Sequence, residues 1–223
     1  MNYYKITNEE EKHNNMQYKD GLNVDILPFN PKGDCEKGGI YFSREDILAF
    51  LNYGPWIRRV ELPKDAKVYE NPGEPKKWKS DKVVLGERRR VDINVVRELI
   101  EEGADVRADD DFALRWTAGN GHLEIVKLLV EQGANARAKD DYALRWAASN
   151  GHLEVVKYLV EQGLSVRAKD DYALRWAAAK SHLEVVKYLV EQGANVRADD
   201  DRALRMAAGS GHLEVVKFLE SLN

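Results

Sequence analysis

The spacing of apolar residues divides the chain into two regions. Beyond residue 90 they return every three or four positions, which is the spacing of amphipathic helices. One unit of this pattern predicts a first helix over residues 143–150 and a second helix over residues 152–162. Gly151 separates the two, and Gly163 stands where a left-handed C-terminal cap belongs. This region is therefore predicted to consist of short helical hairpins.

The hairpin recurs with a period of 30 residues. The sequence Asp-Asp-Tyr-Ala-Leu-Arg-Trp-Ala-Ala begins at Asp140 and again at Asp170, and variants of it begin at Asp110 and Asp200. Other residues keep the same period: His122, His152, His182 and His212, and Gly103, Gly133, Gly163 and Gly193. A single hairpin cannot bury both faces of its helices, so such units must stack. Residues 91–223 are predicted to form an α solenoid of one leading helix followed by four helix pairs.

The repeat unit resembles the ankyrin repeat. The segment Gly-His-Leu-Glu-Val-Val-Lys-Tyr-Leu-Val-Glu-Gln-Gly that begins at Gly151 is similar to the second half of that motif. Ala-Leu-Arg-Trp-Ala-Ala, beginning at Ala143, stands where the family usually has Thr-Pro-Leu-His-x-Ala. The usual period is about 33 residues, and the three missing here fall in the segment that forms the projecting β-hairpin finger. The resemblance therefore implies a short-finger variant of the ankyrin array.

Two details make the resemblance narrower. Arginine replaces the usual histidine of the first helix, at Arg115, Arg145, Arg175 and Arg205. With the 30-residue period, this form is similar to the ankyrin proteins encoded by giant DNA viruses of the Mimivirus type. The segments around Gly21, Cys35 and Trp78 also resemble the leader domain of those viral proteins. The resemblance implies a viral protein that binds a host or a viral protein.

The first 90 residues hold all six prolines and short apolar–polar alternations, which favour strands and turns. Strands are predicted over residues 40–42, 57–62, 66–69 and 82–85. A helix is predicted from an N-cap at Ser43 to Asn52, and residues 72–79 are predicted to form an exposed basic loop. Residues 1–90 are thus expected to be a small α+β domain. Because residues 91–103 match a second helix without its first, this leader domain is expected to cap the array.

Composition and charge limit the partners that we expect. The net charge of −4 divides into +2 over residues 1–90 and −6 over the remainder. Neither part is basic enough to neutralise a phosphate backbone, so nucleic acid is not an expected partner. No apolar run approaches the roughly 20 residues of a membrane span, and the first residues lack the features of a secretory signal. A lone cysteine fits a reducing compartment, so we expect a cytoplasmic protein, in the host cytoplasm if it is viral.

Residue types alone give little support to metal or catalytic chemistry. Histidines one repeat apart should be separated by roughly 8–10 Å, too far to share a zinc ion. The histidines from His122 onward are therefore expected to make structural, turn-closing hydrogen bonds. The aspartate pairs lack the alternation and the glycine of a calcium loop. Cys35 and His13 are residue types that form nucleophile–base pairs, but no catalytic motif surrounds them. We expect no metal, no cofactor and no enzymatic activity.

Two ladders of side chains on the first helices leave alternatives open. Trp116, Trp146 and Trp176 either pack between repeats, since a buried tryptophan removes roughly 150–250 Å² from water, or stand partly exposed as a binding strip. The four arginines either pair with neighbouring aspartates or present their planar guanidinium groups to an acidic partner.

The ankyrin resemblance implies a protein–protein interaction scaffold that binds through the concave face of its first helices. Partner selection is expected at positions that vary between otherwise similar units, together with the arginine ladder. The candidate partner-binding residues are Phe112, Arg115, Asn120, Tyr142, Arg145, Ser149, Asn150, Tyr172, Arg175, Lys180, Arg202 and Arg205. In the alternative, the leader domain is an enzyme or a small-ligand binder that the repeats direct to a target. A pocket gathering Cys35, Tyr41 and a charged residue would favour that alternative.

Overall fold

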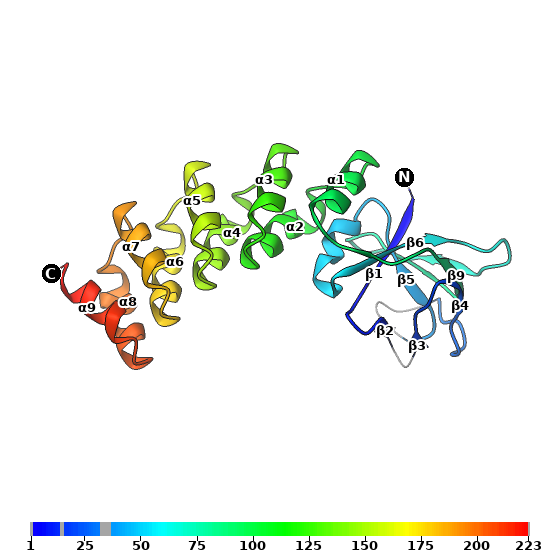
Figure 1. Cartoon of the computed structure of the whole chain (residues 1–223), viewed down its shortest axis with the longest axis horizontal. Helices are drawn as coiled ribbons and strands as arrows, with labels where there is room; N and C mark the ends of the chain where they lie inside the picture. The colour runs from blue at the N-terminus through cyan, green and yellow to red at the C-terminus, as the bar shows by residue number, and fades with distance from the viewer. Residues whose placement is uncertain (1, 14–15, 32–36, 223) are drawn as a thin grey trace. The chain divides into compact units, whose positions relative to one another are not determined.

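The computed structural model of the chain describes residues 2–13, 16–31 and 37–222 (Figure 1). The chain divides into two compact units, Met1–Ala113 and Leu114–Asn223. The break falls within helix α2 (Ala108–Gly119). The first unit therefore contains the N-terminal strands together with α1 (Ile93–Glu101), the helix that opens the array.

An antiparallel sheet forms the centre of the first unit. Its strands follow the order β1–β6–β9–β4, and β10 pairs with the start of β6. These strands are β1 (Tyr3–Thr7), β4 (Gly21–Val24), β6 (Trp56–Glu61), β9 (Lys82–Leu85) and β10 (Arg89–Arg90). The register of β1 against β6 places Lys5 opposite Arg58. Since directly opposed residues share one face of a sheet, these two side chains lie on the same face.

A second sheet, a hairpin and a short helix complete the strand-rich part. The second sheet has the order β5–β8–β7. The remaining elements are β5 (Ile40–Phe42), β7 (Val68–Glu70), β8 (Trp78–Ser80), the hairpin of β2 (Lys12–His13) and β3 (Met16–Gln17), and the 3-10 helix η1 (Ile47–Tyr53). Side chains from both larger sheets meet in one hydrophobic core, which contains Tyr18, Ile40, Phe42, Val60, Trp78, Val83 and Leu85.

The small α+β domain predicted for this region is confirmed, with two differences. The predicted helix with its N-cap at Ser43 is wrong in type and start, because a 3-10 helix begins at Ile47. The Ser43 hydroxyl instead donates to Lys76 O at 2.7 Å, and its backbone pairs with Tyr4. The predicted exposed loop over residues 72–79 is wrong at its end, where Trp78 and Lys79 are buried in β8. In both places pairing with a segment far along the chain overrides the local sequence signal, since Ser43 pairs with Tyr4 and β8 pairs with β5.

Stacked helical hairpins form the repeat region, which confirms the predicted α solenoid. Figure 1 shows the pairs following one another from α3 (green) to α9 (red). The first helices in this part are α4 (Ala138–Ser149), α6 (Ala168–Ala179) and α8 (Ala198–Gly209). The second helices are α3 (Leu123–Glu131), α5 (Leu153–Glu161), α7 (Leu183–Glu191) and α9 (Leu213–Glu220).

Small residues on the first helices let neighbouring repeats approach closely. Ala143, Ala147 and Ala148 are fully buried, and so are Val156 and Leu159 of the following second helix. Equivalent residues are buried in the next repeat, among them Ala177, Ala178, Val186 and Leu189. This apolar stripe is the one that the helical periodicity predicted, and its stacking gives the array a continuous core.

A left-handed turn takes the place of the β-hairpin finger. At the start of each first helix, three successive residues have φ between 51° and 60°. They are Asp109–Asp111, Lys139–Asp141, Lys169–Asp171 and Asp199–Asp201. The left-handed conformation costs an L-residue roughly 1–2 kcal/mol, and aspartate adopts it more readily than most residues. This accounts for the aspartates at the turn, and it makes the fingers short, as the 30-residue period predicted.

Candidate functional site

Arginine and tyrosine side chains of successive first helices alternate in one row. The guanidinium carbon of Arg115 lies 5.6 Å from the centroid of the Tyr142 ring, and that of Arg145 lies 5.2 Å from it. Arg145 also lies 5.0 Å from the Tyr172 ring, and Arg175 lies 5.9 Å from that ring. All four distances fall within the roughly 6 Å over which a cation is attracted to an aromatic face. We call these five residues the Arg–Tyr row.

The arginines of the row also hold the left-handed turns. Arg145 donates from Nε to Asp140 O at 2.9 Å and from Nη2 to Lys139 O at 2.8 Å. Equivalent bonds join Arg175 to Lys169 O and Arg205 to Asp199 O. A carboxylate partner is added at one turn, where Arg175 lies 3.2 Å from Asp199 Oδ2. These arginine side chains are long enough to reach the carbonyls of the turn that precedes them.

Of the tryptophans on the first helices, Trp116 and Trp146 are half-buried and Trp176 is exposed. The Trp146 ring covers Gly119 of the preceding first helix so closely that a Cβ there would lie 2.6 Å from the ring. Its centroid is 5.4 Å from that of Tyr142. The centroid of the Trp176 ring is 5.8 Å from that of the Tyr172 ring, and Trp176 is 37% exposed. Trp146 therefore packs between two repeats, whereas Trp176 presents surface to solvent.

Several of the variable positions lie at the ends of the first helices. Asn150 donates to Gly119 O at 2.8 Å and accepts from Lys180 Nζ at 3.1 Å, so each bond joins two repeats. Ser149 is buried, which removes it from the candidate surface because a covered side chain cannot meet a partner. Of the other candidates, Asn120, Arg202 and Arg205 are exposed, and Phe112 is half-buried in the first unit.

The histidine ladder links successive repeats. Nε2 of His152 lies 3.0 Å from Gly119 O, and Nε2 of His182 lies 3.2 Å from Ser149 O. Each carbonyl belongs to the end of the preceding first helix, so the bond expected to close a local turn instead joins two repeats. Burial lowers the pKa of His122 and of His182 below the ordinary value of an imidazole.

The last aspartate of the left-handed turn makes a second link between repeats. Oδ2 of Asp141 accepts from Ser165 N at 3.0 Å, and Oδ1 of Asp171 accepts from Asn195 N at 2.7 Å. Both aspartates are buried, and burial raises the pKa of Asp171. Histidine and aspartate therefore tie each repeat to a neighbour at two separate places, which accounts for their strict period.

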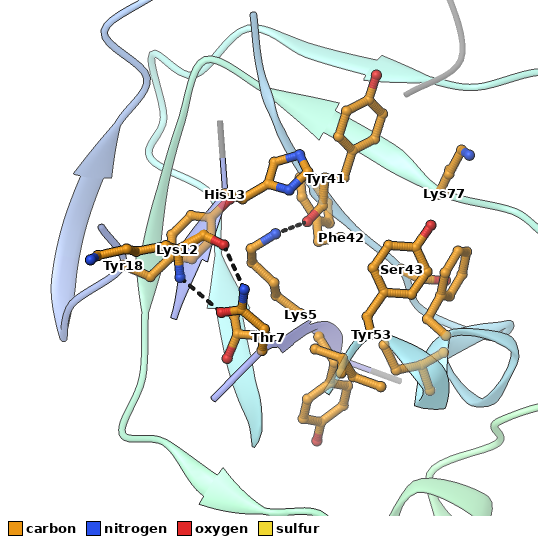
Figure 2. Close-up of a pocket in the computed structure, with 15 residues that line it drawn as sticks. Lys5, Thr7, Lys12, His13, Tyr18, Tyr41, Phe42, Ser43, Tyr53 and Lys77 are labelled. Atoms are coloured by element: carbon orange, nitrogen blue, oxygen red, sulfur yellow. Dashed lines mark hydrogen bonds between the residues drawn. The ribbon is translucent and has the colours of Figure 1, made fainter. Parts of the chain in front are cut away.

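A cavity of 210 Å³ lies in the first unit beside β1, β5 and η1 (Figure 2). Aromatic side chains form much of its wall: Tyr4, Tyr18, Tyr41, Phe42, Phe50 and Tyr53. The charged and titratable side chains at the cavity include Lys5, Lys12, His13 and Lys77. None of the described residues that line it is acidic.

Lys5 is the buried charge of this cavity. Its side chain is 7% exposed, and Nζ donates to Tyr41 O at 2.9 Å. The same Nζ lies 4.5 Å from the centroid of the Tyr18 ring, and Figure 2 shows it in the middle of the lining residues. Burial lowers the pKa of Lys5 to about 7. Burial, followed by the charge of Lys5, also lowers the pKa of His13.

The described residues contain neither the predicted cysteine–histidine pair in full, nor a metal cluster, nor a membrane-spanning helix. The predicted pair of Cys35 and His13 falls partly outside them, because Cys35 lies in the segment 32–36. In the described ranges, no group of three or more His, Cys, Asp or Glu side chains is arranged to hold a metal ion. Within those same ranges, no helix is both long and apolar enough to cross a bilayer.

Comparison with known proteins identifies the repeat region. A family model described as ankyrin repeats (3 copies) matches residues 88–170, and one described as ankyrin repeats (many copies) matches residues 174–220. The chain is 38% identical over 135 residues to one ankyrin repeat protein of Acanthamoeba polyphaga mimivirus and 40% identical over 129 residues to another. It is 36% identical over 128 residues to an uncharacterized protein of the same virus.

The matched segments differ in how much of each relative they span. They cover 54% to 55% of this chain, over the repeat region. They span 44% and 38% of the length of the two ankyrin repeat proteins, which is less than half of each, and 93% of the uncharacterized protein. The likeness to the viral leader domain stays a prediction.

Proposed function

The chain belongs to the ankyrin-repeat family, and from that premise we propose that it binds a protein partner through the face formed by its first helices. Ankyrin repeats are protein–protein interaction scaffolds. The observation that carries the proposed surface is the Arg–Tyr row with Trp146 and Trp176 beside it. Tryptophan, tyrosine and arginine are the residue types that dominate binding energy at protein interfaces.

The rigidity of the row supports this assignment. Arg145 is held by two carbonyls of its own turn while it lies over the rings of Tyr142 and Tyr172. Long side chains lose rotamer freedom when a partner immobilises them, and that loss reduces affinity. In the Arg–Tyr row this rotamer freedom is already lost when the protein folds, so binding of a partner does not reduce it further.

We propose a partner from the host cell or from the virus, met in the host cytoplasm. The viral source of the relatives supports this choice of partner, and the single cysteine of the chain supports a reducing compartment. Lys180 and Arg202 at the edge of the surface are exposed, and they would pair with acidic side chains of that partner.

The proposed role of the leader domain is to cap the array at α1. Within the first unit, Tyr4 OH and Asn2 Nδ2 each donate to the Glu102 carboxylate at 2.9 Å. Arg89 makes two hydrogen bonds with the Glu98 carboxylate, at 2.7 and 2.6 Å. These bonds join strands of the leader to the first helix of the array, which supports its action as a cap.

One observation favours the alternative, in which the leader domain binds a small ligand or acts as an enzyme. The cavity beside Lys5 gathers Tyr41 with charged side chains, which are two of the three features expected of such a site. The third, Cys35, lies outside the described residues. The cavity supports ligand binding as an added property of the leader and leaves the array as the proposed binding surface for protein.

The proposed surface is tested by capture of partners with paired variants of the full chain. Tyr172→Ala combined with Trp176→Ala removes apolar area from the first-helix face, whereas Lys157→Ala combined with Lys187→Ala changes exposed residues of second helices. Tagged chains are incubated with infected-cell lysate, and bound proteins are quantified by mass spectrometry.

We expect the wild type and the Lys157/Lys187 variant to capture the same set of proteins. The captured amount of these proteins should fall at least about tenfold with the Tyr172/Trp176 variant, because truncation of a hot-spot residue costs about 2 kcal/mol or more. Circular dichroism checks that both variants keep their helices. Equal capture by the Tyr172/Trp176 variant would place the binding surface elsewhere.

A further inference from the structure

The cavity of the leader domain has the size and lining of a site for a small molecule. Its 210 Å³ exceeds the roughly 150 Å³ of an apolar cavity that holds benzene. Phe42, Phe50 and Tyr53 form part of its wall. Tyr53 is 51% exposed and His13 is exposed, which gives the cavity an opening to solvent. A single ring or a similar apolar body fits this space.

Lys5 places a positive charge in this apolar space that no described carboxylate neutralises. Among the described residues, Lys5 Nζ donates to the Tyr41 carbonyl at 2.9 Å and lies 4.5 Å from the centroid of the Tyr18 ring. An ammonium group has three N–H donors. Two of those of Lys5 have no acceptor among the described residues and are open to a ligand. A buried ammonium is costly to keep charged unless an anion or several acceptors meet it. The group that would satisfy Lys5 is therefore an anion that enters the cavity.

Basic groups that line the cavity, and Lys79 beside the Tyr41 ring, act in the same direction. Lys77 Nζ lies 5.8 Å and Lys79 Nζ lies 5.0 Å from the centroid of the Tyr41 ring. Lys79 is fully buried, and its Nζ has no hydrogen-bond partner among the described residues. Lys12 and His13 stand on β2 at the exposed side.

The charged groups that could oppose this field are already engaged. Arg58, opposite Lys5 in the sheet, is bound by Glu11 at 2.7 Å and by Asp20 at 2.5 Å, so these carboxylates are neutralised there. Asp25 influences His13 and Tyr18, but its two oxygens accept from Leu27 N and Gly39 N. Asp25 keeps its negative charge and acts on His13 and Tyr18, whereas the charged side chains that line the cavity itself are basic.

We propose that the leader domain binds a small apolar monocarboxylate in this cavity, with the carboxylate on Lys5 Nζ and the apolar body against Phe42 and Phe50. A single ammonium group with one open side matches one carboxylate. The aromatic wall matches a ring or a short hydrocarbon body, which also removes apolar area from water. This site is separate from the proposed protein-binding face, so either proposal can fail without the other.

The protonation of Lys5 gives the site a measurable signature. Burial lowers the pKa of the free Lys5 to about 7, and a bound carboxylate favours its charged form. Binding above pH 7 must therefore be accompanied by proton uptake, and the affinity must fall as the pH rises. An uncharged ligand of the same shape gains nothing from the charged lysine and shows no such fall.

The test is an NMR titration of the isotope-labelled full chain with sodium benzoate, with benzyl alcohol as the uncharged ligand. We expect benzoate to shift amides at the cavity and to bind roughly twentyfold more tightly at pH 6.5 than at pH 8.5, as a one-proton linkage to Lys5 requires. Benzyl alcohol should bind equally weakly at both pH values. Equal affinity for the two ligands, or no shift at cavity residues with either, would overturn the proposal.

Two variants separate the role of Lys5 from a general effect of charge. Lys5→Met keeps the length of the side chain and removes its charge, and Lys64→Met removes an exposed lysine as the matched control. We expect Lys5→Met to lose the pH dependence and at least about tenfold in benzoate affinity, and Lys64→Met to match the wild type. Retained affinity in Lys5→Met would contradict the site. If that variant does not fold, calorimetry of the wild type in buffers of different ionisation heat decides, since binding without proton uptake at pH 8 would also contradict it.

Discussion

At the scale of single residues, the array is held by side chains whose partners lie in a neighbouring repeat. His152 reaches Gly119 O, and Asp141 accepts from Ser165 N. The sequence predicted structural hydrogen bonds for the histidines but placed them within one turn. The partners became visible only when neighbouring repeats were stacked, because they lie 33 and 24 positions away along the chain.

Lys5 is a residue that the sequence did not single out. It stands in the segment Tyr-Tyr-Lys-Ile-Thr, where Tyr4 and Ile6 on either side are apolar. Four residues of this strand in succession, including Lys5, are buried. The sequence feature that could have indicated a buried charge was a lysine within a short apolar run. The burial of Lys5 at a cavity could not be predicted, because it depends on pairing with β6, about 50 positions away, and on η1 and β5, which complete the cavity.

We predict that the free energy of unfolding of the leader domain rises with pH between about 7 and 9. Unfolded Lys5 keeps its proton up to a pKa near 10.4, whereas burial lowers its pKa in the folded state to about 7. The unfolded state binds more protons in this window, so the free energy of unfolding increases by up to roughly 1.4 kcal/mol per pH unit. Urea unfolding at pH 7.5 and pH 9 measures the rise. It should persist in Lys64→Met, and an equal rise in Lys5→Met would refute the assignment to Lys5.

At the scale of elements, apolar spacing predicted the second helices of the array within one or two residues, but it missed the start of the first helices, since the one expected over residues 143–150 is Ala138–Ser149 and includes the left-handed turn. The second helix expected over residues 152–162 is Leu153–Glu161. The left-handed turn was not predictable in the same way, because its stability depends on Arg145 reaching the carbonyls of Lys139 and Asp140. The short strands β1 and β4 were missed for a related reason, since each is defined by its pairing with a strand far along the chain.

Gly119 and Gly209 occupy equivalent positions at the ends of two first helices and offer a matched pair. A Cβ at Gly119 would lie 2.6 Å from the Trp146 ring, whereas a Cβ at Gly209 would meet nothing within 4 Å. We predict that Gly119→Ala destabilises the array by about 1–3 kcal/mol through overpacking. Gly209→Ala should be neutral or stabilising by up to about 1 kcal/mol, since alanine favours a helix.

Thermal or urea unfolding of these two variants measures the difference. Tryptophan fluorescence should also change in Gly119→Ala, because the Trp146 ring must move. If both substitutions have the same effect on stability, the packing of Trp146 against the preceding repeat is wrong.

At the scale of the whole array, stability comes from links that recur at successive interfaces. Histidine and aspartate each contribute a hydrogen bond between repeats, and alanines and leucines bury the surfaces in contact. In such an array the free energy of unfolding is approximately the sum of repeat and interface contributions. A change that weakens every interface at once therefore acts on the whole array.

Acidification acts on the array through two of its histidines, His122 and His182, and we predict that it destabilises the array between about pH 7 and pH 5. Burial lowers the folded-state pKa of His122 and of His182. As the pH falls through about 6.5, the unfolded chain takes up protons that the folded array resists, so the free energy of unfolding decreases. We expect less than about 1 kcal/mol per histidine, because the rings are only partly buried.

Urea midpoints at pH 7.5 and pH 5.5 measure this loss. His182→Gln should reduce it, and His13→Gln corrects for the leader domain, where burial lowers the pKa of His13 in the same direction. A loss that is unchanged in His182→Gln would show that other groups cause it.

The most direct test of the proposed protein-binding face is photo-crosslinking from two tyrosine positions. p-Benzoylphenylalanine is placed either at Tyr172, in the Arg–Tyr row on α6, or at Tyr188, on the second helix α7. After irradiation in infected-cell lysate, position 172 should give a discrete crosslinked protein and position 188 should not. A crosslink at 188 with none at 172 would contradict binding through the first helices.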